Sequence, residues 1–550
     1  MDQELNLQAA NAMSDAYPPI HPPSTRIPPT PIDQLPNEIL MEIFRAFWDL
    51  RLETFLWGHQ PGSLAVLPLC AVSRRWREVA FAVPELWSYV RVNAPDDIEW
   101  MQLARTRSRR HPITLSVVIP DEFAFAEVLP ELEGCRALIC DLTISLAEDE
   151  DAASEIGVLL AGMTMNFLNA GMPALVALAV SIPDWPDLEP PGALLTLDAP
   201  QFPRLRALEV CRLQLSWMPD IFARLRRLST GDCRGDEILS PSEFLDVLAI
   251  SQQLEDVSMK EGMPFHDHAE VIAWNKMDRP LEIANLRKLE IHDDGWLILA
   301  LLQRVRLPVG IHAEFRVYVS GQWDDKVSGL LQMSIPDDPT NVHFLETTTS
   351  ADIVVPVDGH HEEHAHLDCD NADTGRFHII LAFFAYEQPP FMRAQCILED
   401  FRTLFRRAPL RQLSITCDLI RIPHDLWVEV FRTFPSLCEL HLSGEGYPGR
   451  LLAALAARPE EGSASEPLPP PLILPNLNTF TFKDFSWHRD LFGAIVRTFE
   501  GRAVAGASRM REVHVELRGR EKNSDLNSML RLDLATLRQH CDVVVYTDAE

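Results

Sequence analysis

A short apolar phrase recurs along this chain, and its spacing limits the folds open to most of the sequence. The phrase has the form Leu-x-x-Leu-x-Val, with other residues, mostly apolar, in some copies, and successive copies start 20 to 40 residues apart within each of two stretches. The copies begin at Leu175, Leu205, Leu225, Leu254, Leu286, Leu410, Leu437, Leu477 and Met510. A unit of that length holds one strand and one helix and cannot bury its apolar face alone, so neighbouring units must stack.

Helical patterns occupy the segments between the copies. Ser240-Pro241-Ser242-Glu243 offers an N-cap, a first-turn proline and an acid, and apolar residues recur at helical spacing after Ile397 and after Leu426. These periods resemble leucine-rich repeats, and the resemblance implies an α/β fold for residues 93–550: an irregular solenoid of short parallel strands with helices on its convex side. The Asn/Cys position after the strand departs from that pattern at Leu213 and Asp294. An α/β domain with unrelated leucine-rich strands is therefore the alternative.

Three segments differ from the repeating pattern. Residues 307–390 are an irregular middle, with strand-like residues 315–319 and 377–381 around an acidic, His-rich stretch that we expect to be a solvated loop. Residues 458–475 hold Gly, Ser and six prolines and predict a surface loop. Residues 1–30 are rich in proline, which predicts a disordered lead.

Two short helical patterns stand near the N-terminus. In the first, Pro36 suits an opening turn and Glu38 favours the positive helix end. Each pattern has one apolar stripe, made of Ile39, Leu40, Ile43 and Phe44 in the first and of Leu69, Val72, Trp76, Val79 and Ala80 in the second. So small a unit has too little core to bury both stripes internally, which predicts a partner that covers the remaining apolar surface.

These two segments resemble an F-box. The resemblance rests on the opening Leu35-Pro36-x-Glu38, the centre Val72-Ser73-Arg74-Arg75-Trp76 and the close Pro84-Glu85-Leu86-Trp87, and it covers residues 31–92. It implies docking on a Skp-type adaptor and, through the adaptor, on a cullin. Residues 47–66 exceed the usual loop between F-box helices, and they either alter the adaptor fit or lengthen the first helix. The adaptor-binding residues selected by the resemblance are Leu35, Pro36, Ile39, Leu40, Ile43, Leu69, Val72, Ser73, Trp76 and Val79.

Charge and composition exclude several classes of function. The formal net charge of −31 and the pI near 4.9 argue against a surface that binds a phosphate backbone, so no nucleic-acid partner is expected. The ten cysteines contain no C-x-x-C pair, which is typical of reduced thiols in cytoplasm or nucleus. The N-terminus lacks the basic and apolar regions of a signal peptide. The uncharged run at 156–183 is broken by Asn169, Gly171 and Pro173, which predicts a helix and a strand instead of a membrane span.

Two motifs suggest enzyme chemistry, and we interpret both as structural. Residues 360–364 read H-x-x-E-H, a zinc-peptidase string, but Asp358-Gly359 before it and the acidic residues after it do not fit the buried helix that such a site needs. Residues 444–449 read G-x-G-x-x-G, yet Glu445 would face a pyrophosphate and Pro448 removes a backbone donor, so a repeat turn is the better interpretation. We expect no catalytic residue, metal or cofactor, and the competing enzyme hypothesis is a metal or nucleotide site within 358–449.

The resemblances together imply a non-catalytic subunit of an SCF-type (Skp–cullin–F-box) ubiquitin ligase. The F-box would bind the adaptor, and the repeat domain would bind a protein target. Acidic residues 148–151 and 358–373 would favour a basic target surface, although such a charge run is more often only a solubilising surface. The alternative is a repeat scaffold that assembles proteins without ubiquitin transfer.

Overall fold

The computed structural model gives the arrangement of most of the 550-residue chain. Three sequence predictions lie outside the described residues: the proline-rich lead, the acidic residues 148–151, and most of the Pro/Ser loop at 458–475. The described residues are 31–55, 66–94, 97–119, 122–146, 155–182, 194–216, 218–231, 241–261, 281–319, 329–356, 364–371, 375–383, 390–444, 447–456, 472–486, 489–518 and 524–549.

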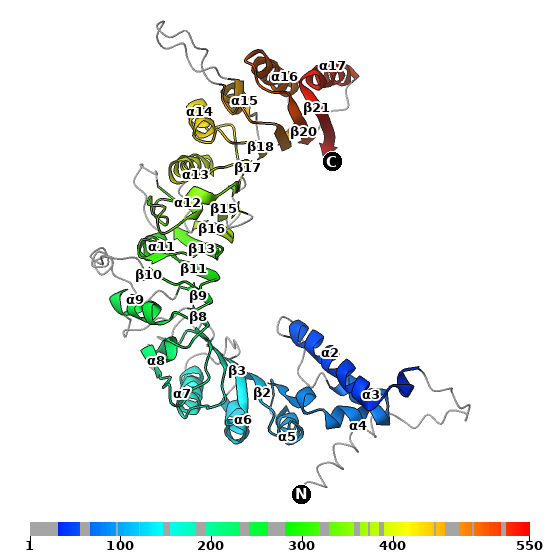
Figure 1. Ribbon diagram of the computed structural model, residues 1–550, viewed down its shortest axis with the longest axis vertical. Coiled ribbons are helices and arrows are strands. Elements are labelled where there is room, and N and C mark those ends of the chain that lie inside the picture. The colour runs from blue at the N-terminus through cyan, green and yellow to red at the C-terminus, as the bar shows by residue number, and fades with distance from the viewer. Residues whose placement is uncertain are drawn as a thin grey trace.

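The chain is a mixed α/β protein built on one large, mostly parallel sheet of 17 strands. In Figure 1 the sheet follows an arc, with strands on its inner side and helices along its outer side, and the N-terminal helices α2 to α4 extend from one end. From that end the strands are β1 (Tyr89–Val92), β2 (Ile113–Ile119), β3 (Ile139–Leu146), β4 (Ala177–Ser181), β6 (Ala207–Cys211), β8 (Arg227–Gly231), β9 (Asp256–Lys260), β11 (Lys288–Asp294), β13 (His312–Val319), β16 (Gly375–Phe383), β15 (His364–Asn371), β14 (Ser350–Val354), β17 (Gln412–Thr416), β18 (Glu439–Ser443), β19 (Thr479–Ser486), β20 (Met510–Arg518) and β21 (Cys541–Ala549).

The remaining elements are helices and two short strand pairs. The N-terminal helical elements are η1 (Pro31–Gln34), α2 (Asn37–Phe55), α3 (Leu67–Val72), α4 (Arg74–Ala82) and η2 (Pro84–Trp87). The later helices are α5 (Ile98–Arg107), α6 (Glu122–Cys135), α7 (Glu155–Asn169), α8 (Pro219–Phe222), α9 (Pro241–Ile250), α11 (Gly295–Leu302), α12 (Phe344–Thr347), α13 (Pro390–Leu404), α14 (His424–Thr433), α15 (Gly449–Ala456), α16 (Arg489–Val504) and α17 (Ser524–His540). The short pairs are β5 (Leu194–Leu195) with β7 (Gln214–Leu215) and β10 (Leu281–Glu282) with β12 (Val305–Arg306).

The recurring phrase marks strands, as predicted. In all nine copies the second and third phrase positions lie on strands of the large sheet, and all three phrase positions are buried in every copy. The reason is the two-residue period of a strand: in β13, Ala313, Phe315 and Val317 face the helices, while the intervening Glu314 and Arg316 face the inner side of the arc. We call that inner, strand-lined surface the concave face.

The middle of the chain reverses the order of the strands. After β13 the chain passes to β14, which pairs with β17, and then returns through β15 and β16 to pair with β13. Among the described strands of the large sheet, only the pairings of β15 with β14 and with β16 are antiparallel. The irregular middle at 307–390 is therefore a three-stranded insertion that keeps the sheet continuous.

One prediction for this region is wrong. The His-rich stretch was expected to be a solvated loop, but residues 364–371 form β15, in the interior of the sheet. Ala365, Leu367 and Cys369 are buried and alternate with polar residues, which is the pattern of a strand with one wet face. The other residues of the H-x-x-E-H string, 360–363, lie outside the described residues.

The uncharged run at 156–183 folds as predicted, as a helix followed by a strand. Helix α7 ends at Asn169, and β4 begins at Ala177. In the described part of the chain, no helix combines the length and the apolar character needed to cross a membrane.

The G-x-G-x-x-G string has a structural explanation at its first glycine. Gly444 has φ +149°, and a Cβ atom there would lie 2.0 Å from the carbonyl oxygen of Cys417. Only glycine permits β18 to end so close to the end of β17. The first glycine therefore serves the packing of neighbouring units, in line with the repeat turn expected here.

Two buried clusters divide the core. One contains Leu40, Phe44 and Trp87 from the N-terminal helices, and the other runs along the whole sheet from Val90 to Cys541. Helix α5 belongs to both, because Trp100 and Leu103 pack on the first cluster while Met101 and Ala104 are buried in the second. The N-terminal helices are thus packed onto the sheet, although their predicted boundary at residue 92 falls at the end of β1.

A buried arginine connects the end of α15 to the residues that precede β19. Arg502 on α16 donates to the carbonyl oxygens of Leu455 (3.3 Å), Ile473 (2.8 Å) and Leu474 (2.7 Å). Burial lowers the pKa of the guanidinium to about 10. One side chain therefore donates to three carbonyl oxygens, of which that of Leu474 also accepts from the backbone N–H of Leu477 (3.2 Å).

We expect Arg502→Leu to lower the free energy of unfolding by roughly 2 to 5 kcal/mol, because it leaves buried acceptors without donors. The exposed Arg497 on the same helix is the matched control, and Arg497→Leu should change the free energy by less than about 0.5 kcal/mol. Urea unfolding of both variants measures the difference. Equal losses would contradict this account.

Candidate functional site: the exposed face of the N-terminal helices

Local hydrogen bonds set the angle between the N-terminal helices. Ser73 is the N-cap of α4, and its Oγ accepts from the backbone N–H of Trp76 at 3.1 Å. Arg75 donates from Nε (3.1 Å) and Nη2 (2.9 Å) to Asn37 Oδ1 at the start of α2, and also to the carbonyl oxygen of Leu35. Ser73, which was predicted to contact the adaptor, thus acts as a cap, and it divides the second helical pattern, predicted as one helix, into α3 and α4. Arg75 fixes residues 35–37 against α4.

The structure divides the ten predicted adaptor-binding residues into two groups. Leu40, Leu69 and Val79 are buried in the core of the N-terminal helices, and Leu35 and Trp76 are partly buried against it. The exposed group consists of Pro36, Ile39, Ile43 and Val72. The side chain of Ser73 is partly buried at its capping position.

The exposed group provides the surface for a partner. Ile39 and Ile43 lie one turn apart on α2 and are 46% and 39% exposed, and Val72 at the end of α3 is 58% exposed. Ile32 on η1, which the sequence reasoning missed, is 38% exposed. We call Ile32, Pro36, Ile39, Ile43 and Val72 the apolar patch.

The N-terminal helices also carry ion pairs on their surface. Arg45 on α2 pairs with Glu42 (2.5 Å) and with Glu85 (3.2 Å), and Arg74 pairs with Glu78 along α4 (3.0 Å). Burial alone would raise the pKa of Glu85, but a backbone hydrogen bond and the charge of Arg45 outweigh it and lower the pKa. Apolar residues amid paired charges are the usual make-up of a protein-binding surface.

The structure describes part of residues 47–66, the segment that exceeds the usual loop between F-box helices. Helix α2 continues to Phe55, so the first helix is lengthened, as one of the two alternatives held. Residues 56–65 lie outside the described residues.

A second feature is the charged centre of the concave face. Glu290 on β11 forms ion pairs with Lys288 (2.9 Å) and Lys260 (3.0 Å). Asp368 on β15 lies 2.6 Å from His378 and 2.9 Å from Arg376. Within the described segments, no group of three or more His, Cys, Asp or Glu side chains has the arrangement needed to hold a metal ion. The charges here pair with one another.

Comparison with known families agrees with the N-terminal geometry. Residues 32–93 match the F-box-like family model. The chain carries an F-box-like domain. No curated protein matches the chain. The F-box-like domain ends at the first strand of the sheet and includes every member of the apolar patch.

The division of the F-box-like domain into core and patch predicts different outcomes for two kinds of substitution. The double change Ile39→Ala with Val72→Ala should weaken adaptor binding at least roughly thirtyfold, since interface hot spots cost about 2 kcal/mol or more, and should leave the fold intact. Leu40→Ala should instead lower the free energy of unfolding by about 2 to 5 kcal/mol.

Binding to a purified Skp-type adaptor by calorimetry, with circular dichroism of each variant, separates these effects. Leu532→Ala, at a residue on α17 that is 69% exposed, is the control and should change neither quantity. Full adaptor binding by the folded double variant would show that the patch is not the interface.

The charged centre of the concave face predicts a pH dependence of stability. Burial alone would raise the pKa of Glu290, but Lys288 and Lys260 outweigh it and lower the pKa from 4.5 to about 2. The stability that Glu290 contributes is therefore present above pH 4.5 and lost as the pH falls toward 2.

We expect Glu290→Gln to be less stable at pH 7 by roughly 2 to 3 kcal/mol and to lose less further stability between pH 5 and pH 2 than the parent chain. Glu209→Gln is the matched control, because Glu209 is exposed on β6 with no ion pair to any described residue. Thermal melts at several pH values measure both. Parallel pH profiles for Glu290→Gln and the parent would contradict this assignment.

Proposed function

We propose that this chain is the substrate-recognition subunit of an SCF-type ubiquitin ligase. The single observation that carries the proposal is that residues 32–93 match the F-box-like family and form helices with an exposed apolar patch. F-box domains generally bind Skp-type adaptors, and an adaptor of that kind would cover the patch and link the chain to a cullin. The chain itself would be non-catalytic.

The sheet is the proposed target-binding part, as an irregular leucine-rich-repeat-like solenoid. Support comes from strands that follow one another in chain order on either side of the β14–β16 insertion, each with one buried and one accessible face. The concave face and its adjoining loops are where such proteins usually hold partners. We propose the cytoplasm or nucleus as the place of action, as the cysteine spacing predicts.

The mechanism would be proximity. Helix α5 packs on both the F-box-like core and the sheet core, so a target on the concave face would be held at a fixed position relative to the adaptor. Holding the target's lysines near a ubiquitin-charged enzyme raises the effective concentration of the reacting groups. The alternative, a repeat scaffold without ubiquitin transfer, shares the adaptor contact but not this consequence.

Reconstitution tests the proposal. The full chain, co-expressed with adaptor, cullin and RING subunits, should co-purify with all three, and proteins captured by the chain from cells treated with a proteasome inhibitor should receive ubiquitin in the assembled complex. The Ile39→Ala, Val72→Ala variant should retain captured proteins but lose both the complex and ubiquitin transfer. Adaptor binding without ubiquitin transfer would favour the scaffold, and failure to bind the adaptor would overturn the proposal.

A further inference from the structure

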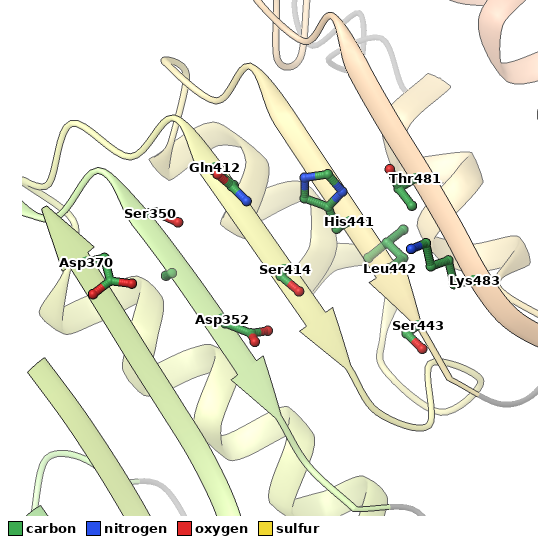
Figure 2. A pocket seen from close by; sticks show the side chains of 11 residues that line it. Ser350, Asp352, Asp370, Gln412, Ser414, His441, Leu442, Ser443, Thr481 and Lys483 are labelled. Atoms are coloured by element: carbon green, nitrogen blue, oxygen red, sulfur yellow. The ribbon is translucent and has the colours of Figure 1, made fainter. Parts of the chain in front are cut away.

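A polar groove lies on the concave face at the point where the strand order reverses. Four neighbouring strands line it, β14, β17, β18 and β19, together with Asp370 of β15, and it encloses about 460 Å³ (Figure 2). A volume of that size falls in the range of ligand sites. The groove exists because the insertion sets β14 beside β17, which follows it in the sequence only after β15 and β16.

The floor of the groove is a row of paired residues. The register aligns Asp352, Ser414, His441 and Thr481 across the four strands. Hydroxyl and imidazole groups on this row can donate to or accept from a peptide backbone laid across the strands. Figure 2 shows their side chains rising from the strands between Asp370 at one end and Lys483 at the other.

One end of the groove is anionic, and its negative charge is only partly compensated. Oδ1 of Asp352 is buried and has no hydrogen-bond partner among the described residues. Asp370, beside it, is 60% exposed on its side chain and lies 4.0 Å from Arg376, at the limit of an ion pair. Asp352 is partly exposed and lines the groove, so a cationic group from a ligand can pair with its carboxylate there and offset the cost of the oxygen without a donor.

The other end of the groove is cationic because Lys483 follows Thr481 on the concave side of β19, in register with Ser443. The pairing with β20 shifts between Phe482 and Phe485, both of which are buried, so Asp484, which regular alternation would direct toward the core, lies on the concave side instead. Asp484, with φ +65°, pairs with Arg518 at 2.6 Å and accepts from Ser443 at 2.9 Å. Its charge is thereby neutralised, and Lys483 forms no ion pair with any described residue.

The distance between the two ends fixes the spacing of complementary groups. Three strand intervals separate β14 from β19, which corresponds to roughly 15 Å at about 4.8 Å per interval with the offset along the strands. An extended peptide rises about 3.3 Å per residue and places every second side chain on the same side, so groups four residues apart reach both ends.

We propose that this groove binds an extended peptide segment of the target in which Arg or Lys stands four residues from Asp or Glu. The basic side chain lies against Asp352 and Asp370, and the acidic side chain pairs with Lys483. The inference deepens the proposed function, on which it rests, by naming the chemistry of the target segment.

Fluorescence anisotropy with labelled ten-residue peptides tests the spacing. In a background of Ala, Gly and Ser, one peptide carries Arg and Glu four residues apart, a second carries them adjacent, and a third has Gln in place of Arg. The first should bind the full chain at least about tenfold more tightly than the other two. Equal affinities, or no binding of any peptide at about 1 mM, would overturn the proposal.

Two variants assign the ends. Asp352→Asn should weaken the first peptide about tenfold and leave the Gln peptide unchanged, because both changes remove the same contact. Lys483→Glu should reverse the preference, so that a peptide with Lys in place of Glu becomes the tighter ligand. Asp256→Asn and Arg227→Glu, on the concave face of β9 and β8 away from the groove, are controls and should behave as the parent chain. An unchanged preference in both groove variants would overturn the assignment.

Adaptor binding, measured on the same preparations, separates the two proposals. A groove variant that keeps its adaptor but loses the spaced peptide supports both. A parent chain that binds adaptor and shows no preference for the spaced peptide overturns the groove proposal alone, whereas failure to bind adaptor overturns the proposed function.

Discussion

The mostly parallel ladder from β1 to β21 is the constraint on which the rest of the structure depends. Each strand of four to nine residues has one apolar face, and it buries that face only when its neighbours and the covering helices are in place. The result is one continuous core from Val90 to Cys541. Since the polar faces all point the other way, the same ladder produces a long accessible surface on the concave side.

The need to bury apolar residues also explains how the F-box-like domain is attached to the sheet. Its helices are too few to cover all of their own apolar residues, which therefore have two different environments. Trp100 and Leu103 of α5 cover part of the domain's core, while Ile39 and Val72 stay open to solvent. The first arrangement fixes the domain to the sheet, and the second leaves the surface that a partner needs.

The insertion of β14 to β16 gives the concave face its local character. In a sheet of purely parallel units, the strands would follow chain order throughout. Here the insertion places β14 beside β17, so that Asp352 and Asp370 lie next to the series of strands that begins with β17. Lys483 faces the same surface through the regular alternation of β19, and the bulge beside it brings Asp484 to Arg518. The insertion thus defines one end of the groove, and β19 supplies the other.

The sequence by itself determined the local elements. The nine copies of the phrase mark strands because a two-residue period with one apolar face admits little else, and the Pro36 signal marks a helix start through backbone chemistry that acts within a few residues. The match of residues 32–93 to the F-box-like family agrees with the resemblance read from those signals.

Only the tertiary structure decided how those elements meet. A helical stripe does not say which of its residues face the core, so Leu40 and Ile39 could not be told apart until Trp87 and Phe44 were placed around the first of them. In β15, buried apolar residues alternate with charged and polar residues, and the high content of charge led to the prediction of a loop. The sheet accommodates these polar residues because one of its faces is exposed to solvent. Asp352 and Lys483 are distant in sequence, and they share a groove because hydrogen bonding between strands, which sequence periodicity does not record, sets the order of the sheet.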